Sequence, residues 1–240
     1  KQQHWTGVFI ELVIVILGVF IGLQASNWNQ ARESAVRRAA ALKRLHDESE
    51  QDVAYFKKFV GLYDGFNADR SQAIRRLLAD DWKAANADRM SEAILTISFY
   101  PAAAPPRSAY DEVIASGSFG SLGDANLRKS ITNYYSGLAF LQGQIAYFRE
   151  ISSDLPGWKT PGIKVLFAPG TSRERRTVMD FAALSKNPDF IQGVIVGNSD
   201  QRGMAGWWHE TLEDAEKMCL ALSRATGRPC APLKAENPKQ

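Results

Sequence analysis

The feature that most constrains this chain is an apolar run near its N-terminus. Between Gly7 and Leu23 the only charged residue is Glu11. As an α-helix this run would be about 26 Å long. Extended to Trp5 and Trp28, it matches the ~30 Å hydrocarbon layer of a bilayer, with a tryptophan at each membrane interface. The run therefore predicts a transmembrane helix, and residues 1–30 are expected to be a membrane anchor.

No other part of the chain approaches 18 consecutive apolar residues, so a single crossing of the lipid bilayer is expected. The run is longer than the 7–15-residue apolar core of a typical cleaved signal peptide, which favours an uncleaved anchor. Residues 31–230 are long enough to form one extramembrane domain with its own core. Residues 231–240 are expected to be a tail.

The composition excludes several classes of function. The 29 basic and 26 acidic residues leave a net charge of +3, which is too balanced for a nucleic-acid-binding protein. The chain has no Cys-x-x-Cys motif, and its histidines are scattered, so neither a metal site nor a cofactor is expected. No nucleophile, base and orienting group follow a recognisable catalytic order, and the protein is not expected to be an enzyme.

The segment after Trp28 contains strong helix formers and no helix breaker before Gly61. The transmembrane helix is therefore expected to leave the membrane as one rod and to end at residues 64–67. Further helices are expected over 68–82, 89–97 and 110–115. The rod has one apolar or small-residue face with a spacing of three and four, made of Leu42, Leu45, Ser49, Val53, Phe56, Val60 and Tyr63.

The clearest helix begins after Asp124, a typical N-cap residue. Its apolar positions repeat at four and three, as in a helix packed lengthwise in a bundle. Residues 154–173 are expected to be irregular, and two more helices are expected after them, from Asn187-Pro188 to Val196 and over 202–226. With no alternating strand pattern, the expected fold is all-α, a transmembrane helix that continues into a helical bundle. The periodic positions are Leu127, Ile131, Tyr134, Leu138, Leu141, Ile145 and Phe148.

Two observations give opposite orientations for the anchor. Lys1 alone precedes the apolar run, whereas several basic residues follow it, and the positive-inside rule would place the domain in the cytoplasm. Cys219 and Cys230, however, lie close together at the end of a predicted helix. Such a pair suits a disulfide in an oxidising compartment, although two separate thiols in a reduced protein would give the same sequence.

Two passages resemble a family of bacterial single-pass inner-membrane proteins of unknown function. The first is the anchor, Glu11-Leu-Val-Ile-Val-Ile-Leu-Gly-Val-Phe-Ile-Gly-Leu-Gln-Ala-Ser-Asn-Trp-Asn. The second begins at Ser108 and contains a Ser-Gly turn, an Asp, a Leu-Arg pair and a Tyr-Tyr. The resemblance implies a bacterial inner-membrane anchor with a mostly helical, periplasmic domain, and it implies no activity.

One side of the predicted anchor carries small residues and its single charge: Gly7, Glu11, Gly18, Gly22 and Ala25. Small residues let transmembrane helices approach closely, and Gly18 to Gly22 is a GxxxG motif. A carboxylate within the membrane is costly, which suggests a donor from another helix. The alternatives for Glu11 are a shallow carboxylate that reaches the headgroups and a proton carrier.

Four other groups of residues have a structural and a functional interpretation. The Gly117–Gly123 loop is expected to be a turn rather than a phosphate site, because it lacks the Gly-Lys-Ser/Thr ending. Arg173, Arg175 and Arg176 are expected to form a solvated basic loop, although they could bind an anion. Trp208 is expected in the core, with Trp207 and His209 beside it. The carboxylate pairs Asp47-Glu48 and Asp80-Asp81 are expected on solvated helix faces.

The sequence favours a non-catalytic, membrane-anchored structural or accessory subunit. Its partners would be other transmembrane helices, from a second copy or from a larger membrane complex. The alternative is a periplasmic helical-bundle sensor that binds a small molecule. Such sensors usually return through the membrane to an output domain, and this sequence has no second apolar run.

Overall fold

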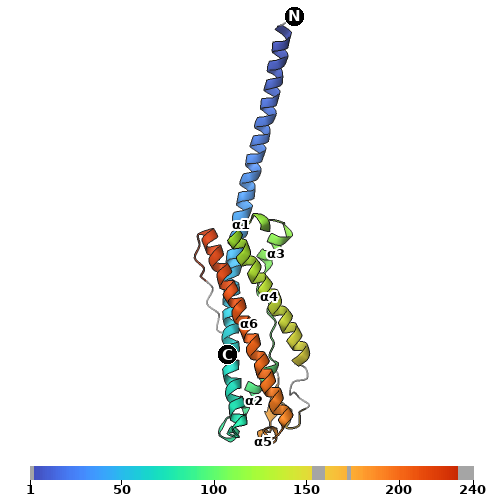
Figure 1. Cartoon of the computed structure of the whole chain (residues 1–240), viewed down its shortest axis with the longest axis vertical. Coiled ribbons are helices and arrows are strands. Elements are labelled where there is room, and N and C mark those ends of the chain that lie inside the picture. The colour runs from blue at the N-terminus through green and yellow to red at the C-terminus, as the bar shows by residue number, and fades with distance from the viewer. Residues whose placement is uncertain (1–2, 153–159, 172–173, 232–240) are drawn as a thin grey trace.

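The computed structural model describes residues 3–152, 160–171 and 174–231. Its dominant element is a single helix, α1 (Gln3–Leu78), which at 1.5 Å per residue is about 114 Å long. Residues 7–40 of this helix are exposed and project from the rest of the molecule (Figure 1). This projecting part is long and apolar enough to cross a membrane. The predicted continuation of the anchor helix into a helical region is confirmed.

The predicted end of this helix at residues 64–67 is wrong. The helix continues through Gly61 and Gly65 to Leu78, and the separate helix predicted over 68–82 is its last part. A glycine in a helix interior costs about 1 kcal/mol relative to alanine. Burial on both sides of the glycines offsets this cost, since Tyr63 and Leu77 are each almost fully buried.

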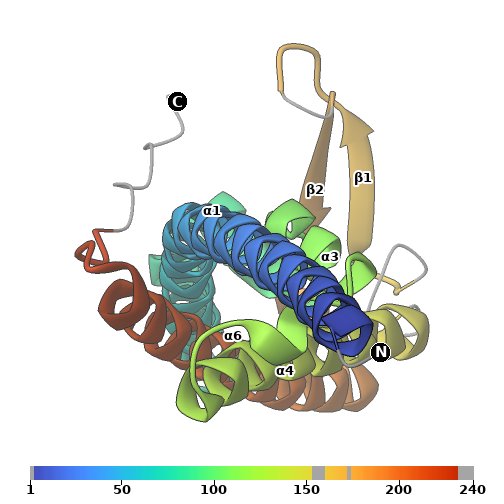
Figure 2. The ribbon, with the colours of Figure 1, turned by 90° about the horizontal axis from the view of Figure 1, so that it is seen from above.

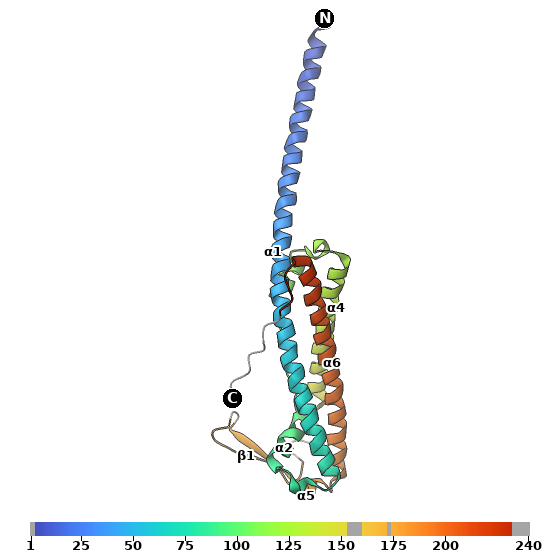
Figure 3. The same cartoon turned by 90° about the vertical axis from the view of Figure 1, so that its left-hand side faces the viewer.

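The C-terminal half of α1 packs with two other long helices, α4 (Ala125–Ile151) and α6 (Pro188–Thr226). Helix α6 lies along both α1 and α4 (Figures 1 and 3). The predicted apolar seam of α4 is confirmed, because six of its seven residues are buried and Phe148 packs against them. The side chain of Asp124 accepts a hydrogen bond from the Leu127 N–H, so the predicted N-cap is also confirmed.

The predicted interruption of the last helix near residues 197–201 is wrong, because α6 is continuous. Two polar side chains in this stretch bind other elements instead of ending the helix. Gln201 donates to the carbonyl of Ile97 over 2.7 Å, and Asn198 accepts from Arg70 Nε over 3.0 Å. Asn198 and Gln201, whose polar character suggested a helix end, thus bind neighbouring segments from within a continuous helix.

Short helices lie between the long ones. Helices α2 (Ala87–Leu95) and α3 (Ser108–Ala115) agree with the predicted segments to within about two residues, a difference that is usual at helix ends. Single 3₁₀ turns occur at η1 (Trp82–Ala84), η2 (Thr96–Ser98) and η3 (Phe119–Ser121). The fold is therefore mostly helical, as predicted.

The described part of the predicted irregular segment contains strand, which the sequence did not indicate. Strands β1 (Ile163–Phe167) and β2 (Arg175–Met179) pair antiparallel, with Ile163 opposite Met179. The hairpin projects to the side of the bundle (Figure 2). Its base joins α2, the end of α1, α5 (Phe181–Leu184) and the start of α6 in a second core at the end farthest from the N-terminus.

Candidate functional site

The face of α1 that carries Gly7, Glu11, Gly18, Gly22 and Ala25 is exposed along its whole length. A Cβ built on any of its three glycines would have no described atom within 4 Å, apart from the helix's own neighbouring backbone. The glycines therefore leave a shallow open groove on the helix. The structure holds these five residues on one straight, continuous helix, at the side predicted from the sequence.

The two tryptophans predicted to lie at the membrane interfaces, Trp5 and Trp28, are both on α1. Trp28 is 66% exposed on α1, beyond the apolar run. Trp5 lies in the first turns of α1, and its side chain is outside the described part of the structure. The separation of the two residues along one unbroken helix is about 35 Å at 1.5 Å per residue. This length is comparable to a bilayer with part of its interfaces.

Cys219 and Cys230 are joined as a disulfide, with their Cα atoms 5.7 Å apart. Cys219 is fully buried on α6, whereas Cys230 belongs to the segment that follows this helix. The chain turns back at Gly227, which has a φ of 71° and so occupies the left-handed region that favours glycine. The disulfide thereby holds the segment after α6 against the bundle.

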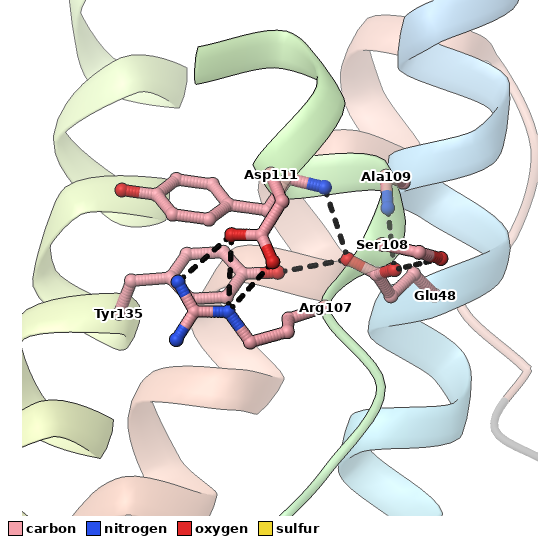
Figure 4. Close-up of polar contacts among 7 residues, drawn as sticks. Glu48, Arg107, Ser108, Ala109, Asp111 and Tyr135 are labelled. Carbon is pink, nitrogen blue, oxygen red and sulfur yellow. Dashed lines mark hydrogen bonds and ion pairs between the residues drawn. The ribbon is translucent and has the colours of Figure 1, made fainter. Parts of the chain in front are cut away.

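The carboxylate of Glu48 is a buried capping group that the sequence analysis missed (Figure 4). It accepts hydrogen bonds from the backbone N–H groups of Ala109 and Tyr110, at 2.8 and 3.2 Å. Ser108 Oγ and the Tyr135 hydroxyl also donate to it, at 3.3 and 2.9 Å. Glu48 thus caps the N-terminus of α3 from another helix, because the residue before α3 makes no side-chain cap of its own.

The expected solvated position of Glu48 is therefore wrong, since its side chain is 5% exposed. Asp80 and Asp81 are exposed, as expected. One pattern in the sequence could have indicated the buried position. Glu48 and Asp52 are four residues apart, beside the apolar face of α1, and like charges at this spacing repel in a helix. Such a pair requires hydrogen-bond donors or protonation to offset the repulsion between the two carboxylates.

Asp52 is the second buried acid on this side of α1, and it lies near Glu48 and the hydroxyl of Tyr134. Neither carboxyl oxygen of Asp52 has a hydrogen bond of standard geometry within the described residues. Burial is the main cause that raises the pKa of Asp52 to about 8. The Glu48 carboxyl acts in the same direction, and the Tyr134 hydroxyl opposes the rise. At neutral pH Asp52 is therefore mostly protonated.

A cavity of about 630 Å³ lies between α1 and the segment from α3 to η3, at the end of the bundle nearest the projecting helix. Three arginines, Arg37, Arg38 and Arg44, are among its lining residues, together with Glu112 and several serines. Arg44 forms an ion pair with Glu112, at 2.7 Å. The lining therefore carries an excess of positive charge.

The glycine-rich loop predicted to be a turn forms the wall of this cavity opposite α1. Gly117 and Gly123 have positive φ angles of 67° and 58°, as the turn interpretation requires. Ser116, Ser118 and Ser121 line the cavity, but their hydroxyls already bond within the loop. The loop is thus a turn, and it also faces arginines that the sequence analysis did not associate with it.

The remaining predicted groups occupy separate places. Trp208 is fully buried and its ring lies among four aromatic rings of α1, which confirms its core position. Trp207 is half-buried. His209 is exposed and forms a hydrogen bond with Asp64. Arg175 and Arg176 lie on β2 rather than in a loop, and Arg176 pairs with Asp88. Arg173 and the tail after residue 231 lie outside the described residues.

No protein-family model, curated protein or solved structure matches the chain. The resemblance to bacterial single-pass inner-membrane proteins therefore stays a prediction.

Proposed function

We propose that the protein is a non-catalytic, membrane-anchored accessory or structural subunit of the bacterial inner membrane. Its anchor would bind another transmembrane helix, and its bundle would extend into the periplasm. The observation that carries this proposal is the continuity of α1 from its exposed apolar part into the core of the bundle. A partner helix bound at the anchor would thus fix the position of the whole bundle.

The face of Gly7, Glu11, Gly18 and Gly22 is the proposed contact. Its glycines leave an open groove, and transmembrane helices associate through close backbone approach at such positions. Glu11 strengthens the proposal, because a carboxylate within the bilayer costs about 2.5–3.5 kcal/mol near the helix centre and a donor from a partner would offset that cost. The disulfide supports a periplasmic bundle, since disulfides persist in oxidising compartments.

Substitution of Gly18 by leucine tests this contact. The leucine side chain would fill the groove and separate the two backbones, so crosslinking between helices should fall severalfold. Val19→Leu is the matched control, because Val19 lies about 100° further around the helix. The measurement is oxidative crosslinking through a single cysteine introduced near Trp28, with the native Cys219–Cys230 disulfide left in place. Products of twice the chain mass would indicate a second copy, and other masses would indicate a foreign subunit.

Equal crosslinking of Gly18→Leu and Val19→Leu would contradict the proposal. Such a result would leave α1 as a lipid anchor without a helix partner on this face.

The cavity favours a second candidate, a periplasmic module that binds a small anion. Arg37 lies 14 residues beyond Leu23 on α1, about 21 Å along the helix axis. A headgroup layer is only roughly 5–8 Å thick on each side of the hydrocarbon. The cavity would therefore receive a soluble anion rather than a lipid headgroup.

Calorimetric titration with citrate and inorganic phosphate tests this second candidate. Binding should weaken about tenfold or more in Arg38→Gln, which removes a cation from the lining. Arg32→Gln, outside the lining residues, is the control. Undetectable binding to the unmodified protein at millimolar concentrations would remove the candidate.

A further inference from the structure

His46 is one of the buried polar side chains in the described part of the chain that lack a hydrogen-bond partner. It is fully buried on α1, yet neither of its ring nitrogens has a hydrogen-bond partner among the described residues. A buried polar group without a partner is destabilising, because its lost hydration is not replaced by a hydrogen bond. Such a group needs an explanation, and an ion bound to the ring is one of the recognised explanations.

Two carboxylates lie beside this ring. A ring nitrogen of His46 and carboxylate oxygens of Asp47 and Glu50 all lie within 4.8 Å of one another. His46 and Glu50 are four residues apart on α1, so their side chains lie on the same face of the helix. Asp47 and Glu50 are only partly buried, which leaves an entry path for an ion from solvent.

We propose that His46, Asp47 and Glu50 bind a divalent transition-metal ion, with zinc as the first candidate. Zinc accepts imidazole nitrogen and carboxylate oxygen at about 2.0–2.2 Å, which puts tetrahedral ligands about 3.4 Å apart. Small side-chain rotations would bring the three ligand atoms to this spacing. An imidazole ligand favours zinc and related metals over calcium or magnesium, which prefer oxygen ligands.

The segment after α6 supplies the outer side of the site. Arg228 Nη1 donates to Asp47 over 2.6 Å, and the backbone N–H of Ala231 donates to Glu50 over 2.8 Å. Each carboxylate has a second oxygen for the metal, and such outer hydrogen bonds orient metal ligands. Asp47 and Glu50 together carry two negative charges and Arg228 carries one positive charge, so one negative charge remains for the metal ion to neutralise. The bound ion would therefore sit on α1, and the disulfide-held segment would orient two of its ligands.

Zinc binding to the full chain in detergent, stripped with EDTA and carrying no histidine tag, tests the proposal. The expected result is one zinc per chain by elemental analysis after gel filtration, with a higher melting temperature on zinc addition. Calcium and magnesium at the same concentration should produce no comparable increase. A parent protein that retains no zinc would overturn the proposal.

Matched variants assign the ligands. His46→Gln and Glu50→Gln should each weaken zinc binding at least tenfold. His209→Gln and Glu213→Gln alter exposed residues elsewhere and should bind zinc as the parent does. Glu50 is only partly buried, so its variant keeps the test valid even if His46→Gln does not fold. Unchanged affinity in Glu50→Gln, or a loss in His209→Gln, would contradict the assignment.

Discussion

At the scale of single residues, the notable feature of α1 is that it buries two acidic side chains, Glu48 and Asp52, on one side. Glu48 is compensated by four donors, which include two backbone N–H groups at the start of α3. Asp52 has no such donor in standard hydrogen-bond geometry among the described residues, and burial keeps it mostly neutral. Two acids four residues apart are thus accommodated in different ways, one by hydrogen bonds and one by protonation.

Asp52 should make the stability of the bundle fall as the pH rises. Its pKa is about 8 in the folded protein and about 3.9 in an unfolded chain. Between these values the folded state holds a proton that the unfolded state has released, so the free energy of unfolding decreases with pH. The expected loss from pH 5 to pH 7 is on the order of 2–3 kcal/mol. Asp52→Asn should remove this slope.

The measurement is urea denaturation at several pH values, in EDTA so that no metal contributes. Well below pH 4, at about pH 3, Asp52 is mostly protonated in both states of the parent, and its ionisation does not destabilise the fold. Above pH 8 Asp52 becomes ionised in both states, and the difference from Asp52→Asn should level off. Parallel pH profiles for parent and variant would show that Asp52 ionises normally in the folded protein.

At the scale of elements, the glycines of this chain have two different roles. Gly65 lies within α1 with a helical backbone and open space around an added Cβ. Gly123 lies just before α4 with a φ of 58°, and an added Cβ would be 2.5 Å from Leu127 Cδ2. The first glycine is therefore replaceable, whereas the second is required by the turn.

Gly65→Ala should raise the free energy of unfolding by about 0.5–1 kcal/mol, because alanine loses less entropy in a helix. Gly123→Ala should lower it by about 1–3 kcal/mol through backbone strain and contact with Leu127. Both effects can be measured by chemical denaturation followed by circular dichroism. A destabilised Gly65→Ala variant would indicate that α1 bends or ends at this residue, as the sequence alone suggested.

At the scale of the whole molecule, one helix joins the projecting apolar part to two separate cores. The larger core lies among α1, α4 and α6, and the smaller one lies at the far end with α2, α5 and the hairpin. The disulfide closes the C-terminal end of α6 onto the larger core. Its loop spans 11 residues, so the chain-entropy estimate of its stabilisation is about 3 kcal/mol.

Cys230→Ser should therefore destabilise the bundle by about 2–3 kcal/mol in denaturation experiments without reductant. Cys230 is the better position to change, because Cys219 is fully buried and its replacement would also disturb packing. The parent protein in reductant should match the untreated variant. If reductant leaves the parent unchanged while the variant is destabilised, the loss comes from side-chain packing rather than from the crosslink.

The sequence alone determined the features that depend on residues near one another in the chain. The apolar run, the spacing of Leu127 to Phe148, the Asp124 cap and the close pair of cysteines each indicated a local structure that the protein contains. These features are readable because hydrophobic periodicity, capping and short loop closure involve only a few neighbouring residues.

Only the tertiary structure decided the features that join distant segments. Glycines at 61 and 65 remain helical because residues beyond them are buried against other elements. Glu48 is buried because α3 and Tyr135, 60 to 87 residues away, supply its donors. The end of α1 and the start of α6 likewise meet only in three dimensions, in the smaller core, since burial and hydrogen-bond partners are set by packing rather than by sequence spacing.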